Sequence, residues 1–241
     1  MKYFTTEWYR EGVASQMHEP MRKTQNAAQF SEKFFEKLYK LEKKAFVRYY
    51  KHAARLQRQS FDATAAEKQF DVNYEENLAF VKENLPEDIL ADVKDVRVLA
   101  LGSVEYDVAA RLERYCGKLK KRCRDAEEQY EEQLELIAEA MGLDTVNALD
   151  SLIDTQIELI EMNGSDLVIG LWGEETRANI TVILRGAQIP ENSQAALGGV
   201  VCRHELLSLE DSISFGLLCV DENSLPFTME ITAKSIEIKL N

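Results

Sequence analysis

Cysteine, proline and histidine are scarce in this sequence, and long apolar runs are absent. The 241 residues include four cysteines, four prolines and three histidines. No two cysteines form a CxxC motif, which argues against a disulfide scaffold and leaves reduced, buried thiols as the expectation. No apolar run approaches the roughly 18 to 20 residues that cross a bilayer, so we expect a soluble protein.

Positive charge is also in deficit. Lysine and arginine number 29 against 42 aspartates and glutamates, which makes the net charge −13. This balance opposes nonspecific attraction to phosphate backbones and anionic membranes. The strongest local exception that we recognise is GKLKKRCR, residues 117–124, which we interpret as a solvated, salt-bridged helix surface; a docking patch for an acidic partner is the alternative. We therefore expect a protein partner, and neither nucleic acid nor a membrane.

Signals for secretion and for common chemistries are missing as well. The start, MKYFTTEWYREG, has no apolar h-region and no small-residue cleavage site, which predicts a cytoplasmic location. The sequence contains no GxGxxG, P-loop, GxSxG or EF-hand pattern, so the common nucleotide, hydrolase and calcium chemistries have no support in it. We predict no catalytic residue and no cofactor.

Two long segments have the three- and four-residue spacing of amphipathic helices. One runs from residue 26 to 58, and the other follows Gly102, with Ser103 as the expected N-cap and Gly142 as the terminator. Their apolar stripes predict an antiparallel helical hairpin or a small bundle. The second stripe can pack within the chain or across a homodimer, because the same spacing serves both.

The segment between these helices, NLPEDILADVKDVRVLALG, is open to two interpretations. Pro86 suits a first helical position, and Gly102 can close a C-terminus. Residues 95–101 are compatible with helix or strand, and we favour helix. Beside the first apolar stripe, Phe35, Phe46 and Tyr50 either widen the core-facing surface, which we favour, or form an exposed patch for another protein.

The pattern changes to strict alternation after Met141. Residues 155–172 form two alternating runs around Asn163-Gly164, a dipeptide that reaches the positive φ of a tight hairpin turn. More alternating runs follow at hairpin spacing, and the last can bend near Ala233-Lys234: NITVILRGAQI, GVVCRHELLSL, SISFGLLCV and FTMEITAKSIEIKL. The sequence thus predicts an α+β protein, with an N-terminal helical domain at 1–145 and a C-terminal antiparallel β domain, a sandwich or partial barrel, at 150–241.

The stretch VVCRHELLSL, residues 200–209, comes closest to an active-site signature. As a strand, it points Cys202 and His204 to one face and Glu205 to the other. Cys202, His204 and Cys219 are then candidate metal ligands, and a thiol paired with His204 is a candidate nucleophile. We favour the simpler interpretation, in which these residues are ordinary members of strands.

Several segments together resemble a family. MKYFTTEWY, the central LPEDILADVKDVRVLALG and the tail with RHELLSLEDSISFGLL and ITAKSIEIKL are similar to a domain family of unknown function from Firmicute-type bacteria. The likeness covers most of the chain, and it departs from the family at Cys202 to His204, where a more aromatic pattern is expected. The resemblance implies a bacterial cytoplasmic origin and carries over no catalytic residue.

These observations favour a non-catalytic interaction or accessory protein, because long amphipathic helices occur without a convergent set of acids, bases and nucleophiles. Two alternatives stay open. One is a metal-dependent or hydrolytic enzyme with its site around Cys202 and His204. The other is an antitoxin-like or small-ligand-binding role for the β domain, which rests on fold analogy alone.

Overall fold

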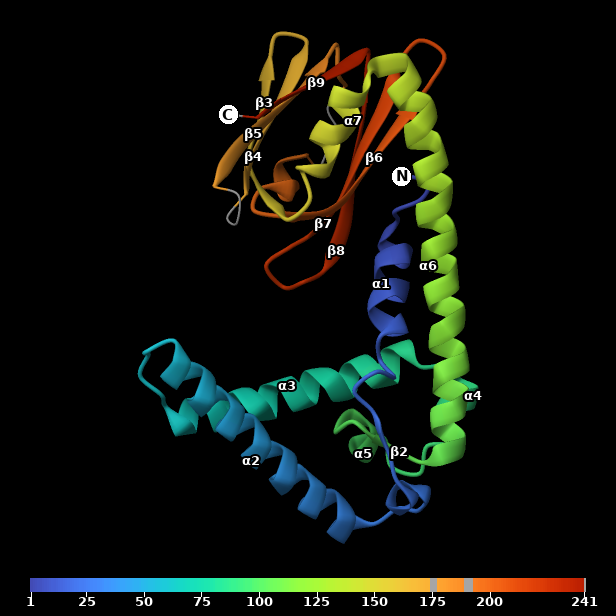
Figure 1. Cartoon of the computed structure of the whole chain (residues 1–241), viewed down its shortest axis with the longest axis vertical. Coiled ribbons are helices and arrows are strands. Elements are labelled where there is room, and N and C mark those ends of the chain that lie inside the picture. Colours follow the sequence, from blue (N-terminus) through green and yellow to red (C-terminus); the bar gives the residue numbers. More distant parts are fainter. Residues whose placement is uncertain (174–176, 189–192, 241) are drawn as a thin grey trace. The chain divides into compact units, whose positions relative to one another are not determined.

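The structure is a computed structural model that describes residues 1–173, 177–188 and 193–240. Helices occupy the N-terminal and middle parts of the chain, and antiparallel strands occupy the C-terminal part (Figure 1). The fold is therefore α+β, as the sequence predicts. Within the described ranges, no helix has both the length and the apolar composition that a membrane crossing requires.

The chain divides into two compact units, and the division differs from the predicted boundary between residues 145 and 150. The helical unit comprises residues 14–119, and the β unit comprises residues 1–13 and 120–241. The difference arises because the first residues and the second half of the long helix α6 (Tyr106–Met141) pack on the sheet. Periodicity shows that a helix is amphipathic, but it does not show what covers each part of its apolar side.

The helical unit consists of helices whose ends are set by capping side chains. Its elements are part of α1 (Thr6–Ser15), β1 (Arg22–Lys23), η1 (Gln25–Ala28), α2 (Glu32–Leu56), α3 (Ala63–Asn84), α4 (Glu87–Leu90), α5 (Val96–Ala100), β2 (Ser103–Val104) and the start of α6. Ser31 and Asp62 accept backbone hydrogen bonds at the starts of α2 and α3. Asp95 caps α5 in the same way, so the favoured helical interpretation of residues 95–101 is confirmed.

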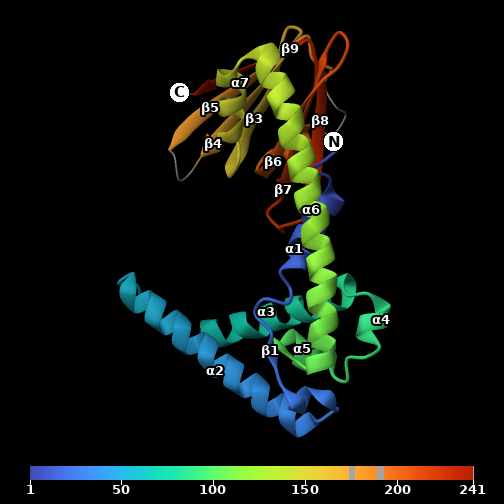
Figure 2. The same ribbon diagram turned by 45° about the vertical axis from the view of Figure 1, so that its right-hand side comes forward.

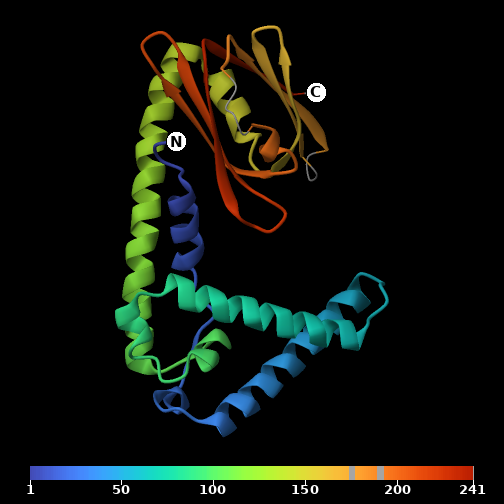
Figure 3. The same ribbon diagram turned by 180° about the vertical axis from the view of Figure 1, so that it is seen from behind.

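The helical hairpin is formed by α2 and α3, which diverge from the short turn that joins them (Figure 3). The sequence prediction instead paired the first long helix with α6 and did not recognise α3. Few residues of α3 form its buried side, and Val72 stays exposed, so its apolar pattern is weak. The buried residues of α3 are Ala66, Phe70, Tyr74 and Val81.

An aromatic cluster holds α2 against α3 and α5. The ring of Tyr39 packs edge-on against Phe70 and Tyr74, with centroid distances of 5.2 and 5.1 Å. Arg97 of α5 forms an ion pair with Glu32 at the start of α2, with 2.8 Å between nitrogen and oxygen. One side of α2 therefore packs into the core of the helical unit.

The β unit contains a seven-stranded antiparallel sheet in the order β8-β7-β6-β3-β4-β5-β9 (Figure 2). Its elements are α7 (Leu143–Asp150), β3 (Thr155–Asn163), β4 (Asp166–Gly173), β5 (Ala178–Arg185), η2 (Ser193–Ala196), β6 (Val200–Ser208), β7 (Ile213–Val220), β8 (Pro226–Ala233) and β9 (Ser235–Leu240). β8 and β9 lie at opposite edges, yet only Lys234 separates them in the chain. The predicted bend therefore joins the two edges into a partial barrel, which hydrogen bonds from Lys234 to Arg185 and from Gln188 to Thr232 support.

Two glycines set chain reversals in the β unit. Gly142 has φ of 91° and follows the last residue of α6, which confirms the predicted terminator. Gly164 has φ of 66° and lies in the two-residue loop between β3 and β4, since Asn163 pairs with Asp166. The predicted hairpin is thus confirmed, with a loop one residue further along than the Asn-Gly dipeptide suggests.

The two halves of the sheet meet between β3 and β6. Gln156 pairs with Val200, and backbone hydrogen bonds from Asp154 to Val201 and from Ile157 to Gly199 flank this pair. Leu149 of α7, Leu152 in the turn after it and Ile137 of α6 pack into the same core as the inward-facing strand residues. The core of the β unit therefore depends on the two helices beside the sheet as well as on the strands themselves.

Candidate functional site

The Cys-Arg-His-Glu stretch lies in strand β6, as the sequence predicts, but a β-bulge changes its geometry. The register shifts after Val201, which makes Cys202 an extra residue in the strand. Leu206, two residues after His204, packs in the core of the β unit, whereas Cys202 packs with aromatic residues of the N-terminal segment. Cys202 and His204 therefore do not share a face, contrary to the predicted alternation.

His204 is buried, and structural contacts occupy its ring. Nδ1 lies 3.2 Å from the Tyr130 hydroxyl, and Nε2 lies 3.6 Å from the Asp150 carboxylate. Because the Tyr130 hydroxyl accepts a hydrogen bond from the Leu206 amide at 2.9 Å, its own proton is directed to Nδ1. Burial lowers the pKa of His204, and the Asp150 carboxylate opposes this effect. The ring is therefore neutral at pH 7 and links α6, α7 and β6.

Glu205 anchors the N-terminal segment to the sheet. Its side chain is buried, and its carboxylate accepts hydrogen bonds from the backbone amides of Lys2, Tyr3 and Phe4 at 2.6, 2.7 and 3.2 Å. Three amide donors compensate the cost of burying this carboxylate. The geometry gives Glu205 a structural role that the sequence did not reveal, because the donors are about 200 residues away.

The two cysteines of this region are free thiols, of which Cys219 is buried and Cys202 is half-buried. Burial raises the pKa of Cys219 to about 12. Burial also raises the pKa of Cys202, and the Asp154 carboxylate adds to this effect. Over the ranges that the structure describes, no three or more His, Cys, Asp and Glu side chains are grouped to hold a metal ion. The structure instead places Cys202 on the opposite side of the strand from the core that contains Cys219.

A continuous cationic surface along α2 was missed by the sequence analysis. Its lysines and arginines recur every three or four residues, are all exposed, and lie on one face of the helix. At 1.5 Å per residue, the surface is about 33 Å long. We call this surface the cation stripe, and it consists of Lys33, Lys37, Lys40, Lys44, Arg48, Lys51 and Arg55.

The cation stripe carries charge that no other described residue neutralises through an ion pair. Elsewhere in the helical unit, Lys43 pairs with Asp71 at 2.7 Å and Arg22 pairs with Glu42 at 2.5 Å. Residues 43–61 contain six lysines and arginines and no acidic residue. The charge of this region is thus reversed relative to that of the whole chain.

Apolar and aromatic side chains accompany the cation stripe. A hollow of about 550 Å³ runs beside it, lined by Val47, by stripe residues, by Lys43 and by Glu67 of α3. Leu41, next to the stripe, is 56 % exposed. Phe46 is half-buried in the core, as favoured from the sequence, but Tyr50 is exposed together with Tyr49. The result is an exposed surface that combines positive charge with apolar area.

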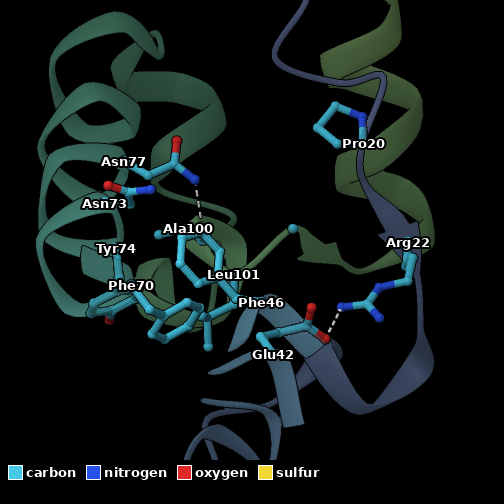
Figure 4. Close-up of a pocket in the computed structure, with 11 residues that line it drawn as sticks. Pro20, Arg22, Glu42, Phe46, Phe70, Asn73, Tyr74, Asn77, Ala100 and Leu101 are labelled. Carbon is cyan, nitrogen blue, oxygen red and sulfur yellow. Dashed lines mark hydrogen bonds and ion pairs between the residues drawn. The ribbon is translucent and has the colours of Figure 1, made fainter. Parts of the chain in front are cut away.

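A second cavity, of about 320 Å³, opens beside α3 within the helical unit (Figure 4). Phe46, Phe70 and Tyr74 give it an aromatic wall, and Asn77 donates a hydrogen bond to the Ala100 carbonyl at 2.7 Å. Its remaining lining mixes polar and apolar residues and includes the ion pair between the side chains of residues 22 and 42. Its size is at the lower end for sites that bind small molecules.

Comparison with known proteins adds no assignment to these surfaces. No family model, no curated protein and no solved structure matches this chain. The resemblance found in the sequence therefore stays a prediction.

Proposed function

We propose that this chain is a non-catalytic binding protein of the bacterial cytoplasm, and that it binds an acidic protein through the cation stripe of α2. The observation that supports the proposal is the stripe itself, which is exposed along its whole length and lacks ion pairs with other described residues. Complementary charge steers association and sets the register of an interface. The free thiols favour a reducing compartment.

A protein partner fits the surroundings of the stripe better than a phosphate polymer does. Leu41, Tyr49 and Tyr50 add exposed apolar and aromatic area, and tyrosine is enriched at protein interfaces. The net charge of −13 opposes the approach of nucleic acid and anionic lipid at long range. A partner with acidic residues around a small apolar patch satisfies both features.

The test reverses the charge of the stripe and measures binding to a defined partner. Proteins retained by the wild-type chain are identified, and the acidic ones are purified and titrated against the wild type and the variant Lys44→Glu/Arg48→Glu/Lys51→Glu. We expect the variant to raise the Kd at least about tenfold, because each substitution turns attraction into repulsion. We expect the Kd of the wild type to rise with salt as well.

The matched control is Lys68→Glu/Lys82→Glu/Lys94→Glu, which makes the same charge change at exposed positions outside the stripe. The control should bind as the wild type does. Equal Kd values for the stripe variant and the wild type would overturn the proposal. Stripe-dependent binding of a DNA duplex or of anionic vesicles, without binding of any acidic protein, would show that the class of partner is wrong.

A further inference from the structure

The second half of α6 carries a stripe of opposite sign. Its carboxylates recur every three or four residues on the side away from Tyr130 and Ile137, which are buried in the β unit. Only Glu128 forms an ion pair within the described part of the chain, with the exposed Arg124 at 3.4 Å. We call this surface the acid stripe, and it consists of Asp125, Glu128, Glu132, Glu135 and Glu139.

The surroundings of the acid stripe strengthen its charge. Residues 125–173 contain thirteen acidic residues and no lysine or arginine. Leu136, which neighbours Glu132 and Glu139 on the helix surface, is 58 % exposed. The acid stripe therefore resembles the cation stripe in form. Each is a row of like charges with an exposed leucine beside it, and the two rows have opposite sign.

The two stripes also match in length and spacing. The five cations from Lys40 to Arg55 span about 22 Å of α2, and the five carboxylates from Asp125 to Glu139 span about 21 Å of α6. Both sets advance three or four residues at a time, so that charges on two packed helices can meet turn by turn. Each stripe also has an exposed leucine beside it, Leu41 on α2 and Leu136 on α6.

We infer that the acidic partner is a second copy of this chain, whose acid stripe on α6 receives the cation stripe on α2. The inference rests on the proposed function and names the partner. The contact joins two different surfaces of the protein. A two-fold symmetric dimer therefore contains the contact twice, whereas a head-to-tail arrangement that does not close forms longer oligomers. Exposed ion pairs are individually weak and are screened by salt, so the association is weak, reversible and sensitive to ionic strength.

The experiment is a charge swap followed by sedimentation of the full chain at several concentrations and two salt concentrations. One variant reverses the cation stripe (Lys44→Glu/Arg48→Glu/Lys51→Glu), and the other reverses the acid stripe (Glu128→Lys/Glu132→Lys/Glu135→Lys). We expect the wild type to self-associate in low salt, and each variant alone to associate at least about tenfold more weakly. An equimolar mixture of the two variants should recover association, because each variant then offers the complement of the other.

The remaining outcomes separate this inference from the proposed function. The control Lys68→Glu/Lys82→Glu/Lys94→Glu, at exposed positions outside both stripes, should associate as the wild type does, and circular dichroism should show that all the chains are folded. Failure of the mixture to associate, or association that depends on only one stripe, overturns the inference. If the cation-stripe variant still loses binding to a different purified acidic protein, the proposed function stands and only the identity of the partner is wrong.

Discussion

Strand β6 and helix α2 use their polar residues in opposite ways. On β6, His204 and Glu205 are only 4 % and 2 % exposed, and both are engaged by other parts of the β unit. On α2, the stripe cations are exposed and make no ion pair with any described residue. Buried polar groups must be hydrogen-bonded, so a cluster of reactive residue types can be fully occupied by structural contacts. An exposed repeat of one charge has no such requirement and stays available for binding.

The largest expected effect is on the β6 side of this comparison. Glu205→Ala removes the acceptor of three backbone amides, two of them buried and one partly buried, so we expect the free energy of unfolding to fall by about 3 to 5 kcal/mol. Urea unfolding followed by tryptophan fluorescence measures it, since Trp8 and Trp172 both belong to the β unit. Glu210→Ala, at an exposed position just after the strand, is the control. Equal midpoints for the two variants would contradict the anchoring role of Glu205.

Removal of one hydroxyl tests the contact between α6 and β6. Tyr130→Phe leaves the Leu206 amide without its acceptor and His204 Nδ1 without its donor. We expect a loss of about 1 to 3 kcal/mol in the free energy of unfolding, because both partners are buried. Tyr106→Phe, which alters an exposed tyrosine on the same helix, should leave the urea midpoint unchanged. A stable Tyr130→Phe chain would mean that water replaces the hydroxyl.

The pH dependence of stability tests the state of His204. Burial lowers the pKa of His204 in the folded protein below its ordinary 6.5, so the unfolded chain takes up a proton first as the pH falls. The free energy of unfolding should therefore decrease below about pH 6.5, by at most about 1.4 kcal/mol per pH unit from this residue. Urea unfolding between pH 5 and 8 should show a smaller decrease in His204→Gln. His18 and His52 are present in both proteins, so identical slopes would show that His204 is not the cause.

The smallest expected effect on stability is on the α2 side. Lys44→Gln/Arg48→Gln/Lys51→Gln removes three charges that have no ion pair among the described residues, so the free energy of unfolding should change by less than about 0.5 kcal/mol. Thermal unfolding of the variant and the wild type measures it. A clear loss of stability would show that the stripe cations stabilise the fold. They would then be structural residues, as His204 and Glu205 are on β6.

The strands were predictable from sequence because alternation and turn residues act locally. The β3–β4 hairpin and the bend between β8 and β9 were both read from short segments. Helix α3 was not predicted, since few of its residues are buried and its apolar pattern is weak. The compact units differ from the predicted domains, because the N-terminal segment and part of α6 pack on a sheet that lies far along the chain.

The sequence predicts only part of the candidate site. The spacing of Lys33 to Arg55 is visible in the sequence, but it is a periodicity of charge, which the apolar periodicity of the same helix does not reveal. Whether the cations lack ion pairs depends on where residues such as Asp71 and Glu67 lie in the fold. The bulge after Val201, which separates Cys202 from His204, depends on the pairing of β6 with β7.

The sequence by itself determined the α+β class, the sheet-forming segments, the charge of −13 and the repeat of cations along one helix, because composition and periodicity are properties of neighbouring residues. The tertiary structure alone decided that Glu205 receives the amides of residues 2–4, that Tyr130 meets His204, and that the cation stripe stays free of ion pairs with the described residues. These outcomes arise from contacts between distant segments, whose formation depends on packing the whole chain rather than on any local pattern.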